Sequence, residues 1–326
     1  MDRRRFCAAA GMAPALLAGA APARAQSPAF NNGQPIVLVV PFSPGGNLDT
    51  VARAVAPELG AALGMPVVIE NKPGAGGVIG ASLVARAAPD GHTLLVTTPN
   101  AITVAPFMVD TDYTLKNFAA VGGLGSASQV VAVNPKGRFQ TMAQLLDEAR
   151  RHEDAVTVGH SGLGTTNHIA LLRLEEASHC HFTAVPFKGS APAITALLGG
   201  QIDAIVDQVT SSYANIRAGK LRGLAVLSAE RDRFLPDVPT LAEAGVGGFT
   251  SMTQSGLVAP AGTPSDTIKQ LNAALNQALQ AATVRERLHG SGSVALVVTP
   301  GQWQRILAAE LETARALDAQ GKLAAD

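Results

Sequence analysis

Two loops in this sequence carry residue types that could bind an anion. The first is Pro41-Phe42-Ser43-Pro44-Gly45-Gly46-Asn47, which follows a β-branched run at Ile36–Val40 and precedes a helical pattern that begins near Asp49. The first N–H groups of a helix lack partners within the helix and its dipole is positive there, so a carboxylate or phosphate can bind without a catalytic side chain. The alternative is a tight turn in which Asp49 only satisfies backbone donors.

The second loop is Gly159-His160-Ser161-Gly162-Leu163-Gly164-Thr165-Thr166-Asn167-His168, which also lies between an apolar run and a helical pattern. In one interpretation it is a second anion-binding helix start. In the other, Thr165, Thr166 and Asn167 only cap the helix. One such loop in each half of the chain predicts a ligand cleft between two domains.

Enzyme motifs in the chain are incomplete. Gly159-His160-Ser161 begins like the nucleophile elbow G-x-S-x-G, but Leu163 stands in the fifth position and no base or acid partner can be assigned. The run from Gly74 to Gly80 resembles a dinucleotide fingerprint whose third glycine is displaced by one position. No second cluster completes four metal ligands with His179-Cys180-His181. We therefore expect no catalytic residue, no cofactor and no metal.

Charged residues near strand ends are further candidates, because ligands of α/β sheets bind at the carboxyl ends of strands. Lys188 follows an apolar run at Thr183–Pro186, where it could neutralise a carboxylate or be a solvated loop charge. Asp203 and Asp207 flank another apolar run. They could contact a polar ligand, or they could be solvent-exposed residues at the two ends of the strand.

Alternating strands and helices must position these residues. Continuous apolar runs between helical patterns predict an α/β fold with parallel sheets and helices on both faces. The expected strands are Ile36–Val40, Val67–Ile69, Thr93–Thr97, Val130–Val133, Val156–Val158, Thr183–Pro186, Ile202–Val206, Leu221–Leu227 and Gly256–Ala259, and the expected helices are Asp49–Leu63, Gly77–Ala87, Met142–Arg151, Thr165–Ala177, Ala191–Leu198, Pro264–Ala281 and Pro300–Leu317.

The N-terminus has the pattern of a signal peptide. Three arginines at positions 3–5 precede an apolar stretch from Phe6 to Ala21, and Ala23-Arg24-Ala25 forms a small-x-small cleavage site. We expect cleavage after Ala25 and export of a soluble protein to the periplasm. The arginines do not decide between the Sec and twin-arginine routes.

Charge and cysteine content exclude several classes of protein. Loss of residues 1–25 removes four of 25 basic and one of 25 acidic residues, which leaves a net charge of −3 and no electrostatic attraction for nucleic acid. Cys7 leaves with the signal peptide, so Cys180 has no intrachain disulfide partner. The apolar core must therefore stabilise the exported chain.

Six segments in a fixed order carry a family resemblance over nearly the whole exported chain. They are PIVLVVPFSPGGNLDTVAR, ENKPGAGGVIGASLVARAAPDGHTLL, SGLGTTNHIALLRL, VPFKGSAPAITALLGGQIDAIVD, GKLRGLAVLSAERDRFLPDVPTLAEAG and GLVAPAGTP. In these segments the chain resembles the receptors of tripartite tricarboxylate transporters, also called Bug receptors. The resemblance implies a two-domain periplasmic-binding-protein-like fold of type II, with parallel-rich sheets flanked by helices and a ligand cleft between the domains. It also implies capture of a small carboxylate and its delivery to membrane permease subunits.

We expect a monomer with a division near Ser126–Gln129 and a return crossing near Thr250–Gln254. Domain 1 would comprise residues 26–126 and 252–326, and domain 2 residues 127–251. Asp49 would organise its loop rather than touch the ligand, because two carboxylates repel. The resemblance and the strand ends together give these expected ligand-binding residues: Phe42, Ser43, Pro44, Gly45, Gly46, Asn47, Asp49, Thr97, Thr98, Asn100, Ser161, Gly162, Gly164, Thr165, Thr166, His168, Lys188, Gly189, Asp207 and Gln254.

Three departures from the family pattern concern the ligand. Phe187 replaces a tyrosine, Gln254-Ser255 replaces a Trp-Phe pair, and Asn47-Leu48 follows the double glycine. Our hypothesis is a ligand more polar than an aromatic acid. Two other functions stay open at this point: an exported hydrolase-like enzyme on the same architecture, and a ligand sensor for a signalling system.

Overall fold

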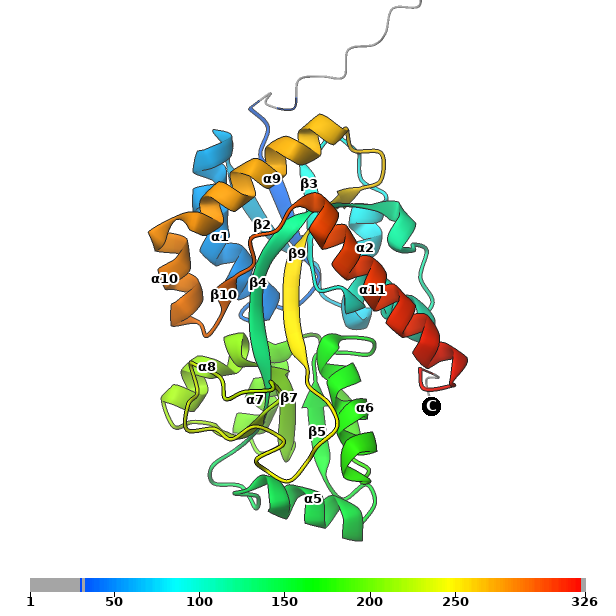
Figure 1. Cartoon of the computed structure of the whole chain (residues 1–326), viewed down its shortest axis with the longest axis vertical. Coiled ribbons are helices and arrows are strands. Elements are labelled where there is room, and N and C mark those ends of the chain that lie inside the picture. The colour runs from blue at the N-terminus through cyan, green and yellow to red at the C-terminus, as the bar shows by residue number, and fades with distance from the viewer. Residues whose placement is uncertain (1–29, 31–32, 324–326) are drawn as a thin grey trace, which may run out of the picture.

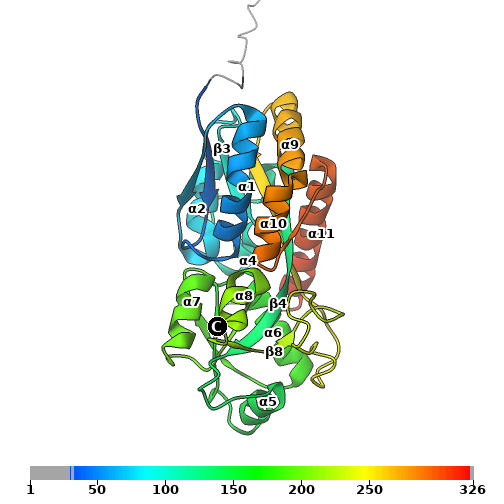
Figure 2. The same cartoon turned by 90° about the vertical axis from the view of Figure 1, so that its left-hand side faces the viewer.

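The alternating strands and helices build two α/β lobes, which lie one above the other in Figure 1 and in the view turned by 90° (Figure 2). The computed structural model describes residue 30 and residues 33–323. The predicted signal peptide lies outside the described residues.

The first lobe is a sheet with helices on both faces. Leu38 and Val40 share one buried cluster with residues of the first and ninth helices, whereas Val39 belongs to a second cluster with the second and last helices. This alternation along one strand buries it on both sides. The elements are β1 (Ile36–Val40), β2 (Val67–Asn71) and β3 (Thr93–Thr97), which are parallel, with α1 (Asn47–Leu63), α2 (Val78–Ala85), α9 (Ser265–Gln280), α10 (Ala282–Gly290) and α11 (Pro300–Ala319).

The second lobe repeats this arrangement. Its parallel strands are β5 (Thr157–His160), β6 (Thr183–Pro186) and β7 (Ala204–Gln208), and its helices are α5 (Met142–Arg151), α6 (Thr166–Ser178), α7 (Ser190–Leu198) and α8 (Val209–Arg217). Val158 of β5 lies in a buried cluster with α5 and α6, and Ile205 of β7 lies in one with α7.

An antiparallel ribbon of β4 (Phe118–Val133) and β9 (Met252–Pro260) joins the lobes (Figure 1). β9 pairs with β3 in the first lobe, and β4 pairs with β7 and with β8 (Arg222–Val226) in the second. The strand order β2-β1-β3-β9-β4-β7-β5-β6 therefore runs through both lobes. The expectation of parallel sheets holds within each lobe and is wrong for the ribbon and for β8, whose pairings are antiparallel.

Both ribbon strands are longer than the sequence pattern predicts. The additional length of β4 is rich in Ala, Gly and Ser, which give no apolar run. Close packing requires such small residues, since a Cβ on Gly256 of β9 would lie 2.4 Å from the Trp303 ring. The expected division at Ser126–Gln129 consequently falls inside a continuous strand.

Several elements have no counterpart in the sequence pattern. They are α8 and α10, the short α3 (Asn100–Thr103), α4 (Ala105–Met108) and β10 (Val294–Ala295), and single 3-10 turns at Ala75–Gly77 and Leu115–Asn117. Beyond α11 the chain reaches the second lobe, where Leu323 shares a buried cluster with Ile169 of α6. Among the residues described, no helix is both long enough and apolar enough to span a membrane.

Candidate functional site

A small cavity lined by both polar and apolar residues lies between the lobes, next to the carboxyl ends of strands from both. It has a volume of about 20 Å³, which is room for about one water molecule. No lining side chain is charged. The lining residues are Phe42, Gly46, Asn47, Leu48 and Thr98 from the first lobe, and Ser161, Thr165, Thr166, Ser190 and Gln208 from the second.

Two helix starts from opposite lobes meet at this cavity. α1 begins after Gly46 and α7 after Gly189, and neither glycine supplies a side chain that caps the first N–H groups. A Cβ on Gly46 would lie 3.8 Å from the backbone nitrogen of Ser190, the first residue of α7. The positive ends of two helix dipoles therefore converge where no lining side chain is anionic, and this convergence favours a bound anion.

Asp49 organises the first loop and does not line the cavity. Its Oδ2 accepts hydrogen bonds from the Gly45 N–H and from Nε of Arg53, both at 2.9 Å, and its Oδ1 accepts one from Nδ2 of Asn71 at 3.0 Å. Burial by itself raises the pKa of Asp49, but the donors Arg53, Gly45 and Asn71 hold it below its usual value. An ionised Asp49 thus fixes the loop whose next residues, Gly46 and Asn47, line the cavity.

Two stacked imidazoles support the second loop from behind. The ring centroids of His160 and His168 lie 4.5 Å apart. Nδ1 of His168 accepts from the Gly164 N–H at 3.3 Å, and Nδ1 of His160 lies 3.1 Å from the carbonyl oxygen of Gly162. Burial lowers the pKa of His168 to about 4, and burial together with the neighbouring His168 lowers that of His160 to about 3. Both rings are therefore neutral at pH 7, and His168 lies outside the cavity lining.

The capping and ligand-site interpretations of the second loop are compatible. Oγ1 of Thr165 caps α6 by accepting from the His168 N–H at 3.4 Å, while its hydroxyl donates to the carbonyl oxygen of Gly162 at 2.7 Å. Ser161 donates to Thr165 at 3.1 Å. Thr165 and Ser161 line the cavity at the same time.

Asp207 lies behind the cavity wall rather than in it. Its Oδ1 accepts from Nδ2 of Asn167 at 3.2 Å, and its Oδ2 accepts from the hydroxyls of Ser211 at 2.8 Å and Ser212 at 2.6 Å. Burial raises the pKa of Asp207, although the hydroxyls of Ser190, Ser212 and Ser211 oppose the shift. Gln208, the next residue, lines the cavity where Asp207 was expected.

The loop after β3 contributes Thr98 directly and Asn100 indirectly. Thr97 is fully buried and donates to the carbonyl oxygen of Thr98 at 2.8 Å. Oδ1 of Asn100 accepts from the Thr166 hydroxyl of the second lobe at 2.9 Å, and its Nδ2 donates to Oε1 of Glu310 on α11 at 2.9 Å. Burial raises the pKa of Glu310. Asn100 therefore links the two lobes beside the cavity.

Backbone contacts close the lobes around the cavity. The N–H and hydroxyl of Ser43 donate to the carbonyl oxygen of Lys188 at 3.1 and 2.9 Å. A Cβ on Gly164 would lie 2.8 Å from Cα of Ala105, so this approach requires glycine. The exposed Lys188 side chain lies outside the cavity lining, so its backbone rather than its charge meets the first lobe.

The other predicted residues lie farther from the cavity. Pro44 and Gly45 are on the exposed side of their loop. Gln254 pairs with Ser126 in the ribbon, and Phe187 packs against a buried cluster of the second lobe. Since neither lines the cavity, their placement gives no support to our hypothesis on ligand polarity. Gly162 and Gly189 also lie outside the lining and contribute through their backbone.

Three lining residues are not among the expected ligand-binding residues: Ser190, Gln208 and Leu48, the last of which is named only as a departure from the family pattern. The rule that ligands bind at strand ends points to Gln208, the last residue of β7, and to Ser190, which begins the helix after β6. Leu48 lies one residue inside α1 and carries no polar signal.

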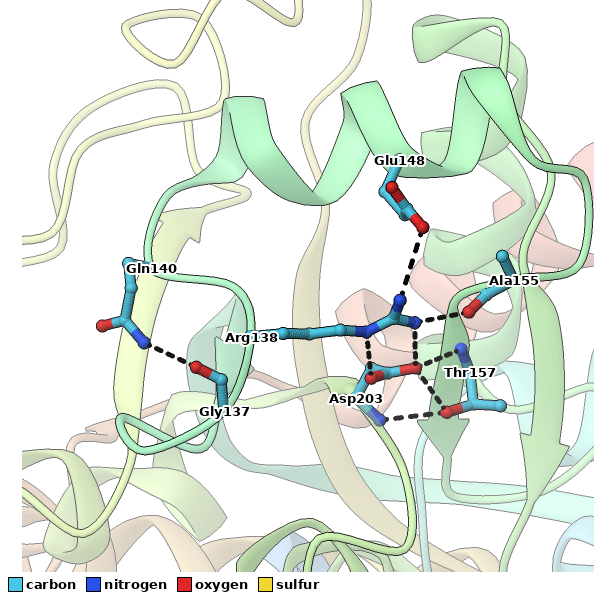
Figure 3. A network of polar contacts seen from close by, with 7 residues as sticks. All are labelled: Gly137, Arg138, Gln140, Glu148, Ala155, Thr157 and Asp203. Carbon is cyan, nitrogen blue, oxygen red and sulfur yellow. Dashed lines mark hydrogen bonds and ion pairs between the residues drawn. The ribbon is translucent and has the colours of Figure 1, made fainter.

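Asp203 belongs to a structural network at the opposite end of β5 (Figure 3). Arg138 donates to its two carboxylate oxygens at 2.9 and 3.0 Å, and the N–H of Thr157, the first residue of β5, donates at 2.9 Å. Burial raises the pKa of Asp203, but Arg138 and Thr157 outweigh it and hold the pKa below its usual value. Asp203 therefore fixes the start of a strand, away from the cavity.

In the described part of the chain, no group of three or more His, Cys, Asp or Glu residues could hold a metal ion. Cys180 is buried with its Sγ 3.0 Å from the hydroxyl of Ser178.

Two α/β lobes joined by a strand ribbon, with helix starts facing each other across an interlobe cavity, define a solute-binding receptor of the type II periplasmic-binding-protein fold. Comparison with known proteins agrees. BugT of Bordetella pertussis is 34% identical over 310 residues, which cover 94% of this chain and 92% of BugT. MatC of Rhodopseudomonas palustris with bound malate is 34% identical at a TM-score of 0.83, covering 87% of this chain and 98% of MatC.

Another R. palustris protein, solved with adipate, is 31% identical at a TM-score of 0.84 and covers 90% of this chain and 98% of its own. The family model "Tripartite tricarboxylate transporter family receptor" matches residues 51–320. The chain belongs to this family, as the sequence resemblance predicts.

Proposed function

We propose that this protein captures a small organic acid by its carboxylate in the interlobe cavity and delivers it to membrane permease subunits. The observation that carries the proposal is the meeting of the α1 and α7 starts at a cavity without charged side chains. The relatives solved with malate and adipate support it, because both ligands are carboxylates.

Binding and closure are coupled in this proposal. In this closed arrangement the cavity has room for about one water molecule, so the lobes must separate to admit an acid. A carboxylate between α1 and α7 is contacted by both lobes only in the closed form. The ligand therefore shifts the population toward closure.

The receptor acts in the periplasm as a monomer after removal of its signal peptide behind Ala25. It needs no cofactor and no nucleic acid. Its domains comprise residues 26–126 with 252–326 and residues 127–251, and the first boundary lies within β4. The position of the first boundary inside a strand suits a hinge, since the chain crosses between lobes without a free linker.

A hydrolase is the weaker alternative because no neighbour activates Ser161. Its hydroxyl donates to Thr165, and Nδ1 of the adjacent His160 lies against the Gly162 backbone. We therefore propose binding without catalysis. A sensor for a signalling system would use the same cavity, and copurification with permease subunits or with a receptor kinase would separate these partners.

A thermal-shift screen combined with product analysis tests the proposal. The panel contains dicarboxylates, tricarboxylates, keto acids, amino acids and nicotinate. A ligand bound only by the folded state stabilises it by about 2.7 kcal/mol at 100 times its Kd, so we expect a concentration-dependent rise in Tm without product. Turnover of any acid, or no shift with any of them, would contradict the proposal.

A further inference from the structure

Hydroxyl groups form most of the polar wall of the cavity, and hydrogen bonds to neighbouring acceptors fix the direction in which four of them, Thr165, Ser161, Ser190 and Thr166, donate. Thr165 donates to the carbonyl oxygen of Gly162, which can only accept, so its proton is committed. Ser161, 3.1 Å from Thr165, must therefore be the donor of that pair. Ser161 consequently presents lone pairs to the cavity.

Asp207 fixes the hydroxyl of Ser190 through two amides, and this hydroxyl also lies close enough to the carboxylate to lower its pKa. The carboxylate of Asp207 accepts from Nδ2 of Asn167, which turns Oδ1 of Asn167 toward its donor, Nε2 of Gln208. Nε2 of Gln129 donates to the same Oδ1 at 3.3 Å. Gln208 is thereby oriented with its Oε1 toward Ser190, whose hydroxyl donates to it at 3.1 Å. The proton of Ser190 is therefore committed to Gln208, and the Ser190 oxygen keeps its lone pairs for another donor.

Glu310 plays the corresponding part for Thr166, across the lobe boundary. Its Oε1 accepts from Nδ2 of Asn100, so Oδ1 of Asn100 faces Thr166 and accepts its hydroxyl proton. Neither Glu310 nor Asp207 lines the cavity. Two buried carboxylates thus set the hydrogen-bond direction of two hydroxyls that do.

The part of the wall formed by Ser161, Ser190 and Thr166 presents lone pairs, which favours a ligand that donates there. A ligand hydroxyl can donate to Ser161, Ser190 or Thr166, whereas a methylene in its place leaves buried acceptors without a donor. An ammonium group also donates, but it would lie close to the positive helix starts at Gly46 and Gly189. The required donor is therefore uncharged.

We infer that the cavity selects a hydroxycarboxylate over the same acid without its hydroxyl, and that Asp207 and Glu310 act as positioning residues for this preference. The inference rests on the proposed carboxylate binding and adds the second functional group of the ligand. Its carboxylate lies at the starts of α1 and α7, and its hydroxyl donates to the hydroxyl oxygens of the wall.

Isothermal titration calorimetry with matched acids tests the preference. The pairs are malate and succinate, lactate and propionate, and 3-hydroxybutyrate and butyrate, with aspartate as the ammonium analogue. We expect a hydroxy acid to bind at least tenfold more tightly than its partner, and malate more tightly than aspartate. Equal or tighter binding of the plain acids overturns the inference and leaves the carboxylate receptor standing. If none of the seven acids binds, the inference fails, and the wider thermal-shift panel decides separately whether the proposed function stands.

Asp207→Asn and Glu310→Gln test the two positioning residues. Each replaces an acceptor by an amide that can also donate, so the neighbouring asparagine can turn and release a hydroxyl proton toward the cavity. We expect the affinity ratio of hydroxy acid to plain acid to fall at least threefold in each variant. Structural damage alone would weaken both acids alike and leave this ratio unchanged.

The matched controls are Asp147→Asn on α5 and Glu312→Gln on α11, which remove the same charge from exposed carboxylates. Both should keep the wild-type ratio. If Asp207→Asn does not fold, Glu310→Gln decides the role of the carboxylates. A wild-type ratio in every folded variant overturns that role.

Discussion

The stacked pair of His160 and His168 should make the folded protein lose stability in mild acid. Burial holds their pKa values at about 3 and about 4, against an ordinary value of 6.5. Between these values the unfolded chain binds protons that the folded chain does not bind. The free energy of unfolding therefore falls as the pH falls below about 6.5, and the loss ends below the folded pKa values.

The magnitude follows from the proton linkage alone. Lowering the pH from about 7.5 to about 5 stabilises an unfolded-chain imidazole of ordinary pKa by about 2 kcal/mol, and the folded rings take up almost no proton over that range. The two histidines together then lower the free energy of unfolding by about 4 kcal/mol. This is a large part of the roughly 5–15 kcal/mol by which a domain is stable. Buried Glu310 and Asp207, whose pKa values are raised, act in the opposite sense.

The double variant His160→Asn/His168→Asn isolates the histidine contribution. The asparagine Oδ1 can replace Nδ1 of His168 as acceptor for the Gly164 N–H, and it does not titrate. Urea unfolding at pH 7.5 and pH 5 should show that the wild type loses about 4 kcal/mol more than the double variant, with about half of that for each single variant. His152→Asn, at an exposed position, should behave as wild type. An equal loss in wild type and double variant would refute the reasoning.

Three further substitutions test the loops. Gly46→Val should fold normally, because its Cβ meets no atom closer than 3.7 Å. Its methyl groups would occupy the carboxylate site between the helix starts, so calorimetry should show at least a tenfold loss of affinity. Wild-type affinity would count against this site. Gly164→Ala places a side chain on a residue with a φ of +70° and a Cβ 2.8 Å from Cα of Ala105 in the other lobe. Small-angle scattering with saturating acid should therefore show a more open particle than the wild type. A fully closed particle would contradict the role of Gly164 in lobe closure. Asp49→Asn weakens charge-assisted hydrogen bonds and should lower the free energy of unfolding by about 1–3 kcal/mol at pH 7 in urea, with a loss below about 0.5 kcal/mol as the contrary result.

The loops were the part of the site that the sequence could predict. A β-branched run, glycines and a helical pattern specify a strand, a turn and a helix start over a few residues, so Gly46 and Thr165 could be placed at helix starts without knowledge of the fold. It could not be predicted in this way that Gln208 rather than Asp207 lines the cavity. Which of two successive residues at a strand end faces the cavity depends on the pleat and twist of the sheet, and both are polar.

Only the ends of the ribbon strands, Val130–Val133 and Gly256–Ala259, were predicted, and the rest of the ribbon was missed for a different reason. An apolar run identifies a buried strand whose own side chains are large. Much of β4 instead has small side chains, and neighbouring elements pack closely against its backbone. Such a strand has the composition of a loop. The partner of each ribbon strand is also distant in sequence, so no short-range pattern reports the pairing of Ser126 with Gln254.

The two lobes are connected by the paired strands of the β4–β9 ribbon, so a change in the angle between the lobes must bend this ribbon. We expect opening to break contacts such as those of Ser43 with Lys188 and of Thr166 with Asn100 and to leave the ladder of the ribbon paired. The free energy needed to bend the two strands then contributes to the fraction of ligand-free molecules that are closed. Apparent affinity scales with that closed fraction, so a substitution among the small residues of β4 would retune ligand capture from a position that no ligand touches.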